Sequence, residues 1–174
     1  KDLLFPWRTI EKNICLPMEL AGVPAAEQAK RCRDVLTQVG LLEYMKKYPK
    51  DLSGGMKQRV SIVRALSYDA PLLLMDEPFG ALDAQTRTQL QSELLETWEN
   101  DKKTCFFITH DVDEAIILAQ KVIVMSARPG RVKAVIDIDI PYPRDQETKM
   151  SPRFLELKNE IWSLVYQEYL EVRK

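Results

Sequence analysis

Two short apolar runs separated by a helical stretch constrain the fold of this chain more than any other feature. Residues 72–75 read Leu-Leu-Leu-Met, and residues 104–108 read Thr-Cys-Phe-Phe-Ile. Unbroken apolar runs of this length predict strands that are buried on both faces, as the strands of parallel sheets are. Because residues 70–140 alternate strand, helix, strand, helix and strand, we predict an α/β fold with a parallel sheet core.

Polar side chains follow both apolar runs. Asp76 and Glu77 lie between the first run and Pro78, and His110, the only histidine, follows the second. The carboxyl ends of parallel strands share the edge at which open α/β sheets bind ligands. One carboxylate there can serve Mg²⁺, and the other can orient or deprotonate a water molecule. Taken alone, the pattern fits two solvated acids and a surface histidine equally well.

A third feature is the octapeptide at residues 52–59, Leu-Ser-Gly-Gly-Met-Lys-Gln-Arg. Ser53 is a good helix N-cap, and Gly54 and Gly55 would let a ligand approach the backbone N–H groups of a helix start. Such an end carries roughly half a positive charge and suits a phosphate. By itself, Ser-Gly-Gly also fits a loop before an ordinary helix. Residues 80–83, Gly-Ala-Leu-Asp, predict a turn in which Asp83 caps the next helix.

In order and spacing, four segments of this chain resemble landmarks of ABC transporter ATPase subunits. They are the signature sequence (52–59), the Walker B strand (72–77), the D-loop (80–83) and the switch histidine (109–111). The resemblance covers nearly the whole chain and implies ATP and Mg²⁺ as ligands. It also implies a partial P-loop NTPase-like domain, with a helical subdomain, a parallel-sheet core with helices and a C-terminal helix.

The resemblance implies a role for each matching residue. Asp76 would act on Mg²⁺ through water, Glu77 would be the general base for ATP hydrolysis, and His110 would contact the γ-phosphate. Asp83 would communicate across a dimer of ATPase subunits. The ATP held mainly by the opposite subunit would be contacted by Ser53, Gly54, Gly55 and Gln58.

A narrower resemblance concerns the residues near the start of the chain. Residues 4–9, Leu-Phe-Pro-Trp-Arg-Thr, are similar to a Leu-Leu-Pro-Trp-type segment in importers for nitrate, taurine, alkanesulfonates and related solutes. Residues 126–131 and 141–144 also look like that subfamily, whose members work with a membrane permease and a solute-binding protein. The resemblance implies that Phe5, Pro6 and Trp7 contact the permease. The alternative is a hydrophobic staple before a helix.

The chain also departs from the family. No G-x-x-x-x-G-K-S/T phosphate-binding motif occurs in it. We therefore expect the carboxyl-terminal portion of an ATPase subunit, which is inactive in ATP hydrolysis on its own and has an exposed apolar sheet face. A second subunit, identical or not, would complete the site. Two alternatives remain, a non-catalytic module that supplies signature residues in trans and an ABC ATPase without a transport role.

Composition limits the partners. Lys and Arg total 25 against 26 Asp and Glu, so no basic field suggests nucleic acid. No apolar run approaches the roughly 18 residues that span a bilayer. We expect a peripheral location at the cytoplasmic face of the cell membrane, reached through a protein partner. The three cysteines lack metal-site spacing and are expected to be reduced.

Three zones are expected along the chain. Residues 1–68 form a helical signature subdomain that includes the permease-contacting segment, with helices at 9–20, 24–39 and from near 55. Residues 69–140 form the α/β core, in which strands 121–126 and 132–138 pair around a Pro-Gly turn. Residues 141–174 form a linker and one helix.

Overall fold

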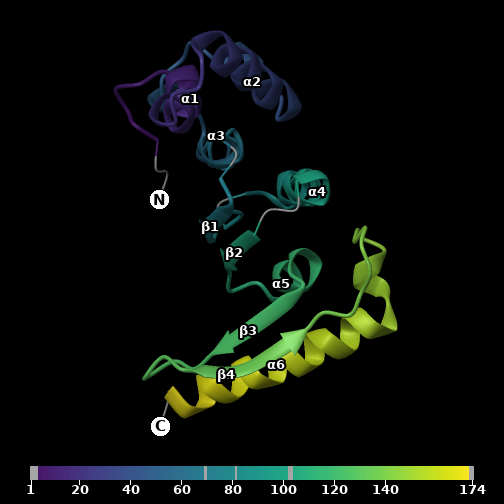
Figure 1. The fold of residues 1–174 in the computed structure, drawn as a ribbon. Helices are drawn as coiled ribbons and strands as arrows, with labels where there is room; N and C mark the ends of the chain where they lie inside the picture. The colour runs from purple at the N-terminus through teal and green to yellow at the C-terminus, as the bar shows by residue number, and fades with distance from the viewer. Residues whose placement is uncertain (1–3, 69, 81, 102–103, 173–174) are drawn as a thin grey trace. The chain divides into compact units, whose positions relative to one another are not determined.

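The computed structural model describes residues 4–68, 70–80, 82–101 and 104–172 of the chain. These residues form two compact units, an N-terminal unit (Lys1–Ile108) and a C-terminal unit (Thr109–Lys174) (Figure 1). The division between the units follows the second strand, whereas the sequence suggested divisions near residues 68 and 140. The third helix and the segment after the first strand share hydrogen bonds, so the predicted helical subdomain and the first strands belong to one unit.

Three α-helices build the first part of the N-terminal unit: α1 (Ile10–Leu20), α2 (Ala25–Gln38) and α3 (Gly54–Leu66). Their bounds agree with the predicted helices to within about two residues. The Thr9 hydroxyl caps α1 by accepting from the Lys12 N–H at 3.3 Å. Gly40, with φ +66°, follows the end of α2, where a left-handed residue is favoured.

The helices pack on one another through apolar side chains. Helix α1 contacts both α2 and α3, and α2 contacts α3. Two short 3₁₀-helices, η1 (Leu42–Tyr44) and η2 (Pro49–Asp51), connect α2 to α3. Fully buried side chains from all three α-helices form this core: Ile10, Ile14, Met18, Cys32, Leu36 and Val60.

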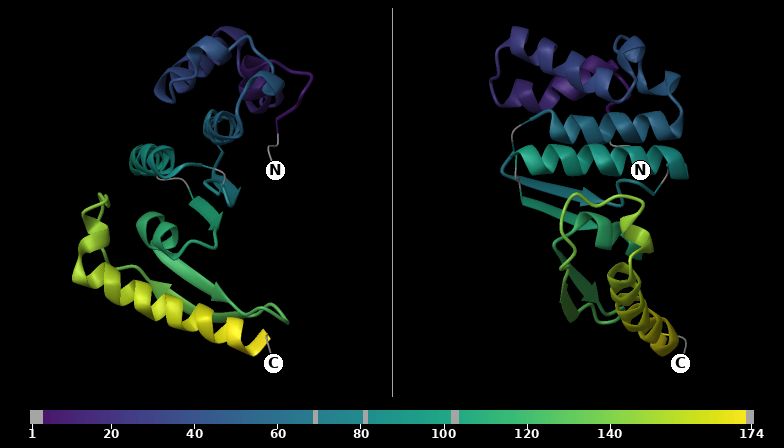
Figure 2. Two further views of the ribbon diagram at one scale, coloured as in Figure 1. Left: turned by 180° about the vertical axis from the view of Figure 1, so that it is seen from behind. Right: turned by 90° about the vertical axis from the view of Figure 1, so that its right-hand side faces the viewer.

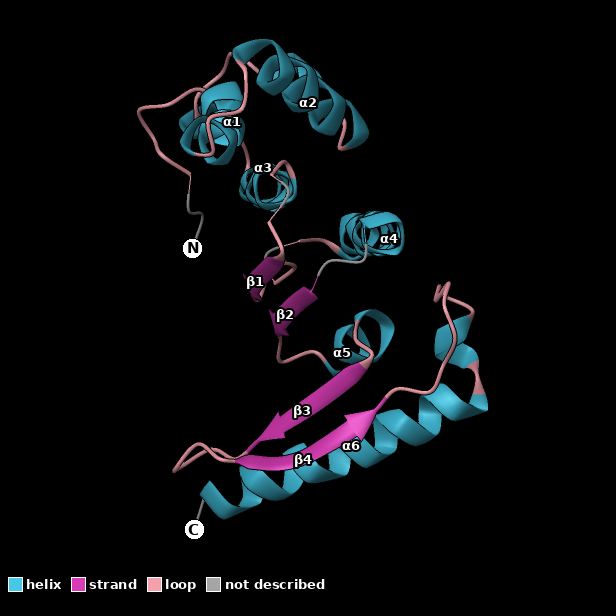
Figure 3. Ribbon diagram, in the orientation of Figure 1, coloured by secondary structure: helices cyan, strands magenta, loops and turns pink. Residues whose placement is uncertain are grey.

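The predicted parallel pair of strands is confirmed. Strands β1 (Leu72–Asp76) and β2 (Thr104–Ile108) pair in parallel, with Asp76 opposite Ile108, and α4 (Ala84–Asp101) connects them (Figure 3). Helix α4 lies alongside α3 (Figure 2). The carboxyl ends of both strands therefore meet at one sheet edge, as the sequence predicted.

The prediction that both strands are buried on both faces is wrong for the described residues. Burial alternates along β1, and most of β2 is exposed. Leu74 is 71% exposed, and Phe106 and Ile108 are more than half exposed. The reason is that described residues cover one face of β1, where Leu73 and Met75 are buried, and little of β2. The exposed apolar face agrees with the expectation from the sequence.

The C-terminal unit is a hairpin packed with helices. It contains α5 (Val112–Leu118), β3 (Lys121–Met125), β4 (Val132–Asp137), the 3₁₀-helix η3 (Thr148–Met150) and α6 (Pro152–Val172). Strands β3 and β4 pair antiparallel, as predicted for the segments around the Pro-Gly turn. Among the described residues β3 pairs with β4, and the expectation that β3 also continues the parallel sheet stays a prediction.

Helix α6 docks on the rest of the C-terminal unit through apolar side chains of one face. Phe154, Leu157 and Ile161 are buried, and α6 contacts α5 and β3. Near the end of α6, the Lys133 ammonium group donates to Glu168 at 2.7 Å. In the described part of the chain, no helix combines the length and the apolar character needed to cross a membrane.

A buried arginine holds the linker of the C-terminal unit together. The Arg144 guanidinium donates to the backbone carbonyls of Ile116, Ala119, Ile138 and Ile140 at 2.6–3.2 Å. It also lies 4.1 Å from the centroid of the Tyr142 ring. Burial lowers the pKa of Arg144, while its donors satisfy carbonyls at the end of α5. The sequence marked this segment only as a family feature.

Candidate functional site

The first part of the candidate site is the start of helix α3. Ser53 is its N-cap, and its hydroxyl accepts from the Met56 N–H at 3.3 Å. Ser53 and Gly54 are exposed, and a Cβ added at Gly54 would meet no atom within 4 Å. The backbone N–H groups at this helix end are therefore open to a ligand that carries negative charge.

The end of strand β1 carries the two predicted acids. Asp76 is the last residue of the strand and is exposed. Glu77 is also exposed and adopts φ +44°, the one positive φ found at a non-glycine residue in the described part of the chain. A left-handed conformation costs such a residue about 1–2 kcal/mol. Backbone outliers of this kind cluster at functional sites, because surrounding contacts must hold them in place.

Hydrogen bonds hold Glu77 in this conformation. Its N–H donates to the Ile108 carbonyl at 2.8 Å, across the end of the sheet. Its carbonyl accepts from the Gly80 N–H at 3.2 Å, which closes a tight turn over Pro78 and Phe79. Phe79 is fully buried, and its ring lies 6.0 Å from the Phe107 ring. The turn that begins at Glu77 is thus anchored in the core of the N-terminal unit.

Helix α3 is tied directly to this turn. The Gln58 side-chain amide donates to the carbonyls of Glu77, at 3.3 Å, and Pro78. A Cβ at Gly55 would lie 3.7 Å from the Leu82 side chain. The structure therefore brings together the signature, Walker B and D-loop segments, which the sequence identified separately. Sequence reasoning missed the bonds from Gln58, since nothing in the local pattern indicates them.

Asp83 caps helix α4, as predicted. Its carboxylate accepts from the Thr86 N–H at 2.9 Å, and hydrogen bonds from the backbone and hydroxyl of Thr86 lower its pKa. The Arg59 guanidinium in turn donates to the Thr86 hydroxyl at 2.8 Å. A second contact therefore joins α3 to the start of α4. The Asp83 carboxylate stays ionised at neutral pH.

His110 belongs to the C-terminal unit and is exposed. It stands between Thr109 and Asp111, which is the N-cap of α5 and accepts from the N–H groups of Asp113 and Glu114. The Thr109 hydroxyl donates to the buried Glu114 carboxylate at 2.8 Å. Both neighbours of His110 are thus held by hydrogen bonds. The contact of His110 with a phosphate stays a prediction.

The predicted permease-contacting segment precedes α1. Trp7 is 71% exposed, and its ring lies 5.2 Å from that of Phe5. The Arg8 N–H donates to the Phe5 carbonyl at 3.1 Å, so these residues form a turn. Asn13, fully buried in α1, accepts from the Phe5 N–H and donates to carbonyls of the same turn. This role of Asn13 was not predicted from the sequence, although a polar residue in an apolar helix stripe is a signal for it.

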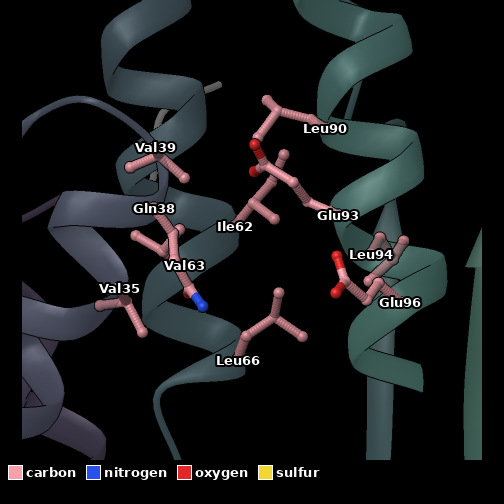
Figure 4. A pocket seen from close by; sticks show the side chains of 10 residues that line it. All are labelled: Val35, Gln38, Val39, Ile62, Val63, Leu66, Leu90, Glu93, Leu94 and Glu96. Atoms are coloured by element: carbon pink, nitrogen blue, oxygen red, sulfur yellow. The ribbon is translucent and has the colours of Figure 1, made fainter. Parts of the chain in front are cut away.

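A separate apolar pocket of about 430 Å³ lies between α2, α3 and α4 (Figure 4). None of the predicted site residues lines it. Its polar side chains are one amide and two carboxylates, and the negative charge of the carboxylates repels a phosphate. We therefore do not assign nucleotide binding to this pocket. Its lining is Val35, Gln38, Val39, Ile62, Val63, Leu66, Leu90, Glu93, Leu94 and Glu96.

The site suits a divalent metal that is shared with a phosphate. Asp76 offers exposed carboxylate oxygens, which are hard ligands of the kind that Mg²⁺ prefers. Among the residues that the structure describes, no group of three or more His, Cys, Asp or Glu side chains could enclose a metal ion. Mg²⁺ commonly keeps several waters and binds through one or two carboxylates and substrate phosphates, so the residues present fit this ion.

Comparison with known proteins finds similarity to ATP-binding proteins of ABC transporters. Residues 1–80 match a family model described as ABC transporter. The chain is 47% identical to a putative ATP-binding protein of Brucella abortus, over 95% of this chain and 64% of that protein. It is 46% identical to the taurine import ATP-binding protein TauB of Rhizobium johnstonii, over 95% of this chain and 65% of that protein. It is also 46% identical to an aliphatic sulfonates import ATP-binding protein, SsuB, of Bacillus cereus, over 91% and 61%.

Solved structures resemble the chain as well. The dimeric ATP-binding cassette MJ0796, in a post-hydrolysis state bound to ADP and Pi, has a TM-score of 0.69 and 31% identity. That match covers 78% of this chain and 59% of the cassette chain. The present chain thus spans less than two thirds of the length of these relatives.

Proposed function

The chain belongs to the ABC transporter family of ATP-binding proteins, and we propose that it is part of an ATPase subunit that drives solute import. Its fold is that of ABC ATPase cassettes, as the sequence predicted. The complete subunit would couple ATP hydrolysis to uptake of a small solute such as nitrate, a sulfonate or taurine through a membrane permease. Relatives named as taurine and sulfonate import proteins support this class of solute.

One observation carries the proposal. The open N-terminus of α3, the acids that end β1 and the Asp83 cap of α4 converge within one unit through direct contacts. An anion-ready helix end and an exposed pair of carboxylates are two of the parts that phosphoryl transfer to water uses, and in the proposed dimer they would serve different ATP molecules. Neither feature alone would distinguish this function from a loop followed by solvated acids.

The residues have distinct roles in the proposed reaction. Glu77 accepts a proton from the attacking water, and His110 contacts the γ-phosphate. Asp76 holds Mg²⁺ through water, and the ion neutralises charge on the phosphates when bound. Asp83 relays changes across the dimer. Ser53, Gly54 and Gly55 face the γ-phosphate of an ATP that is held mainly by a second ATPase subunit.

The partners follow from the same proposal. Two ATPase subunits, forming a homodimer in the simplest case, enclose the ATP between them. The exposed Trp7 and its neighbours Phe5 and Pro6 contact the permease, which in turn receives the solute from a solute-binding protein. The assembly places this subunit at the cytoplasmic face of the membrane, with no nucleic acid involved.

Replacement of the proposed base tests the function. In a full-length subunit that contains these residues, Glu77→Gln should leave ATP binding nearly intact and abolish steady-state hydrolysis. Glu43→Gln, at an exposed glutamate of the same unit, is the matched control and should keep normal turnover. Normal turnover in Glu77→Gln would remove Glu77 from the role of base.

The 174-residue chain itself offers a second test. Because it contains no phosphate-binding P-loop motif, we propose that it does not hydrolyse ATP alone. Titration with Mg·ATP, followed by calorimetry, should show no tight binding. A dissociation constant in the micromolar range or below would contradict this. Stimulation of an intact subunit by the added chain would instead favour a module that acts in trans.

A further inference from the structure

The Gln58 side chain forms hydrogen bonds within its own chain. Its amide nitrogen donates to two carbonyl oxygens, those of Glu77 and Pro78. Carbonyl oxygens only accept hydrogen bonds, so the nitrogen rather than the oxygen of the amide must face them. The assignment of the two amide atoms therefore follows from the partners. This arrangement uses the donors of Gln58 on the turn that carries the proposed base.

Gln58 bonds to the turn at Glu77, whose left-handed backbone conformation is costly unless surrounding contacts hold it. Glu77 has φ +44°, and its N–H and carbonyl are bonded to Ile108 and Gly80. The Gln58 amide adds a third bond to this residue and one to the next. The Glu77 carboxylate folds toward the turn, since a Cβ at Gly80 would lie 3.8 Å from the Glu77 Oε2 atom. The backbone conformation of Glu77 therefore decides where its carboxylate lies.

Helix α3 connects Gln58 to the anion-ready helix end. Gly54 and Gln58 are four residues apart, about one helical turn, on the same helix. The Arg59–Thr86 hydrogen bond at 2.8 Å holds the adjacent position of α3 against the start of α4. A helix moves as a rigid element over one turn, so a displacement of the α3 start reaches the carbonyls of Glu77 and Pro78 through Gln58.

We propose that Gln58 is a positioning residue that holds the backbone of Glu77 in its left-handed conformation and links that conformation to the start of α3. This role rests on the proposed function, in which Glu77 is the base. It differs from the role implied by family resemblance, in which Gln58 contacts the ATP of the opposite subunit. The two roles predict different kinetics.

Steady-state kinetics of the full-length subunit separate the two roles. Gln58→Met keeps the length of the side chain and removes its donors, so kcat should fall about 10- to 100-fold while KM for ATP stays unchanged. Gln58→Lys supplies a new donor and should recover most of kcat. The matched control is Gln89→Met, at an exposed glutamine of α4 whose amide donates to the Glu93 carboxylate at 2.9 Å. That control should behave as wild type.

A double-mutant cycle measures whether Gln58 acts on hydrolysis through Glu77, which a general loss of stability would not imitate. In the Glu77→Gln background, Gln58→Met should cause no further loss of the slow hydrolysis that single-turnover measurements still detect, because both changes act through the same base. Unchanged kcat in Gln58→Met would overturn the proposal. A raised KM with unchanged kcat would also overturn it, and would assign Gln58 to the ATP contact.

Hydrogen exchange on the 174-residue chain keeps this inference separate from the proposed function. The Gly80 N–H, which donates to the Glu77 carbonyl, should exchange at least 10-fold faster in Gln58→Met than in wild type, with Gln89→Met unchanged. Unchanged exchange would overturn the inference. If the full-length wild type hydrolyses no ATP, the proposed function fails, while this measurement still decides whether Gln58 holds the turn.

Discussion

Asn13 offers the sharpest test of how the segment before α1 is held. Its side chain is fully buried, and its Oδ1 atom accepts from the Phe5 N–H at 2.7 Å. Its Nδ2 atom donates to the carbonyls of Phe5, Arg8 and Thr9 at 3.0–3.1 Å. One side chain thus satisfies four backbone groups of the turn that presents Trp7.

Two replacements of Asn13 separate two effects, the loss of its hydrogen bonds and the placement of an acceptor against other acceptors. Asn13→Ala removes these contacts, in which the two N–H groups of the amide are shared among three carbonyls; a full hydrogen bond is worth about 0.5–1.5 kcal/mol net, and water reaches part of the turn once it loosens. We expect the free energy of unfolding of the N-terminal unit to fall by about 2–4 kcal/mol. Asn13→Asp keeps the acceptor for Phe5 but turns an oxygen toward three carbonyls, so near neutral pH it should cost more than Asn13→Ala.

The pH dependence of Asn13→Asp has a definite sign. Burial and the facing carbonyls raise the pKa of the new carboxyl in the folded state above its unfolded value of about 3.9. The deficit relative to wild type is therefore smallest below about pH 3.9 and grows as the pH rises through the folded pKa. Asn13→Ala introduces no titrating group and should show no such change.

Urea unfolding with residue-resolved hydrogen exchange measures these effects in the N-terminal unit. The Phe5 amide should lose protection in Asn13→Ala, which removes its acceptor, and trypsin should cleave after Arg8 faster than in wild type. Asn159→Ala, at an exposed position of α6, is the matched control. A loss below about 0.5 kcal/mol in Asn13→Ala, the size of an ordinary surface change, would refute the reasoning. Unchanged protection of the Phe5 amide would refute it as well.

Two further predictions concern the C-terminal unit. Arg144→Lys cannot reproduce the planar set of donors to backbone carbonyls and should lower stability by about 3 kcal/mol in thermal unfolding, whereas Arg153→Lys, at an exposed ion pair, should change it little. A hydrogen bond from the Lys133 ammonium lowers the pKa of Glu168 below its usual 4.5, and a hydrogen bond from the Ala127 N–H lowers it further by a smaller amount. The ionised carboxylate therefore stabilises the unit above pH 4.5 and loses this effect as the pH falls through the lower folded pKa. Acid unfolding followed by circular dichroism should show this dependence in wild type and a weaker one in Lys133→Met; equal curves would contradict it.

Local signals accounted for much of the fold. The caps Ser53 and Asp83 and the helix bounds followed from sequence, because a cap and its helix lie within one turn of each other. The parallel order of β1 and β2 followed from two apolar runs joined by a helix. The burial of these strands did not follow, because it depends on which elements cover each face. The place of the third strand in the parallel sheet stays a prediction, because the described residues show only its antiparallel pairing with β4.

The sequence by itself determined the family, the helix end that can bind an anion, and the two acids at the end of a strand. Each of these is a contiguous motif whose chemistry depends on near neighbours along the chain. Only the tertiary structure decided that Gln58 holds the Glu77 turn, that Asn13 holds the Phe5 turn and that Arg144 closes the C-terminal unit. The physical reason is that each side chain satisfies backbone groups whose positions are set by the packing of elements, and no sequence period encodes that packing.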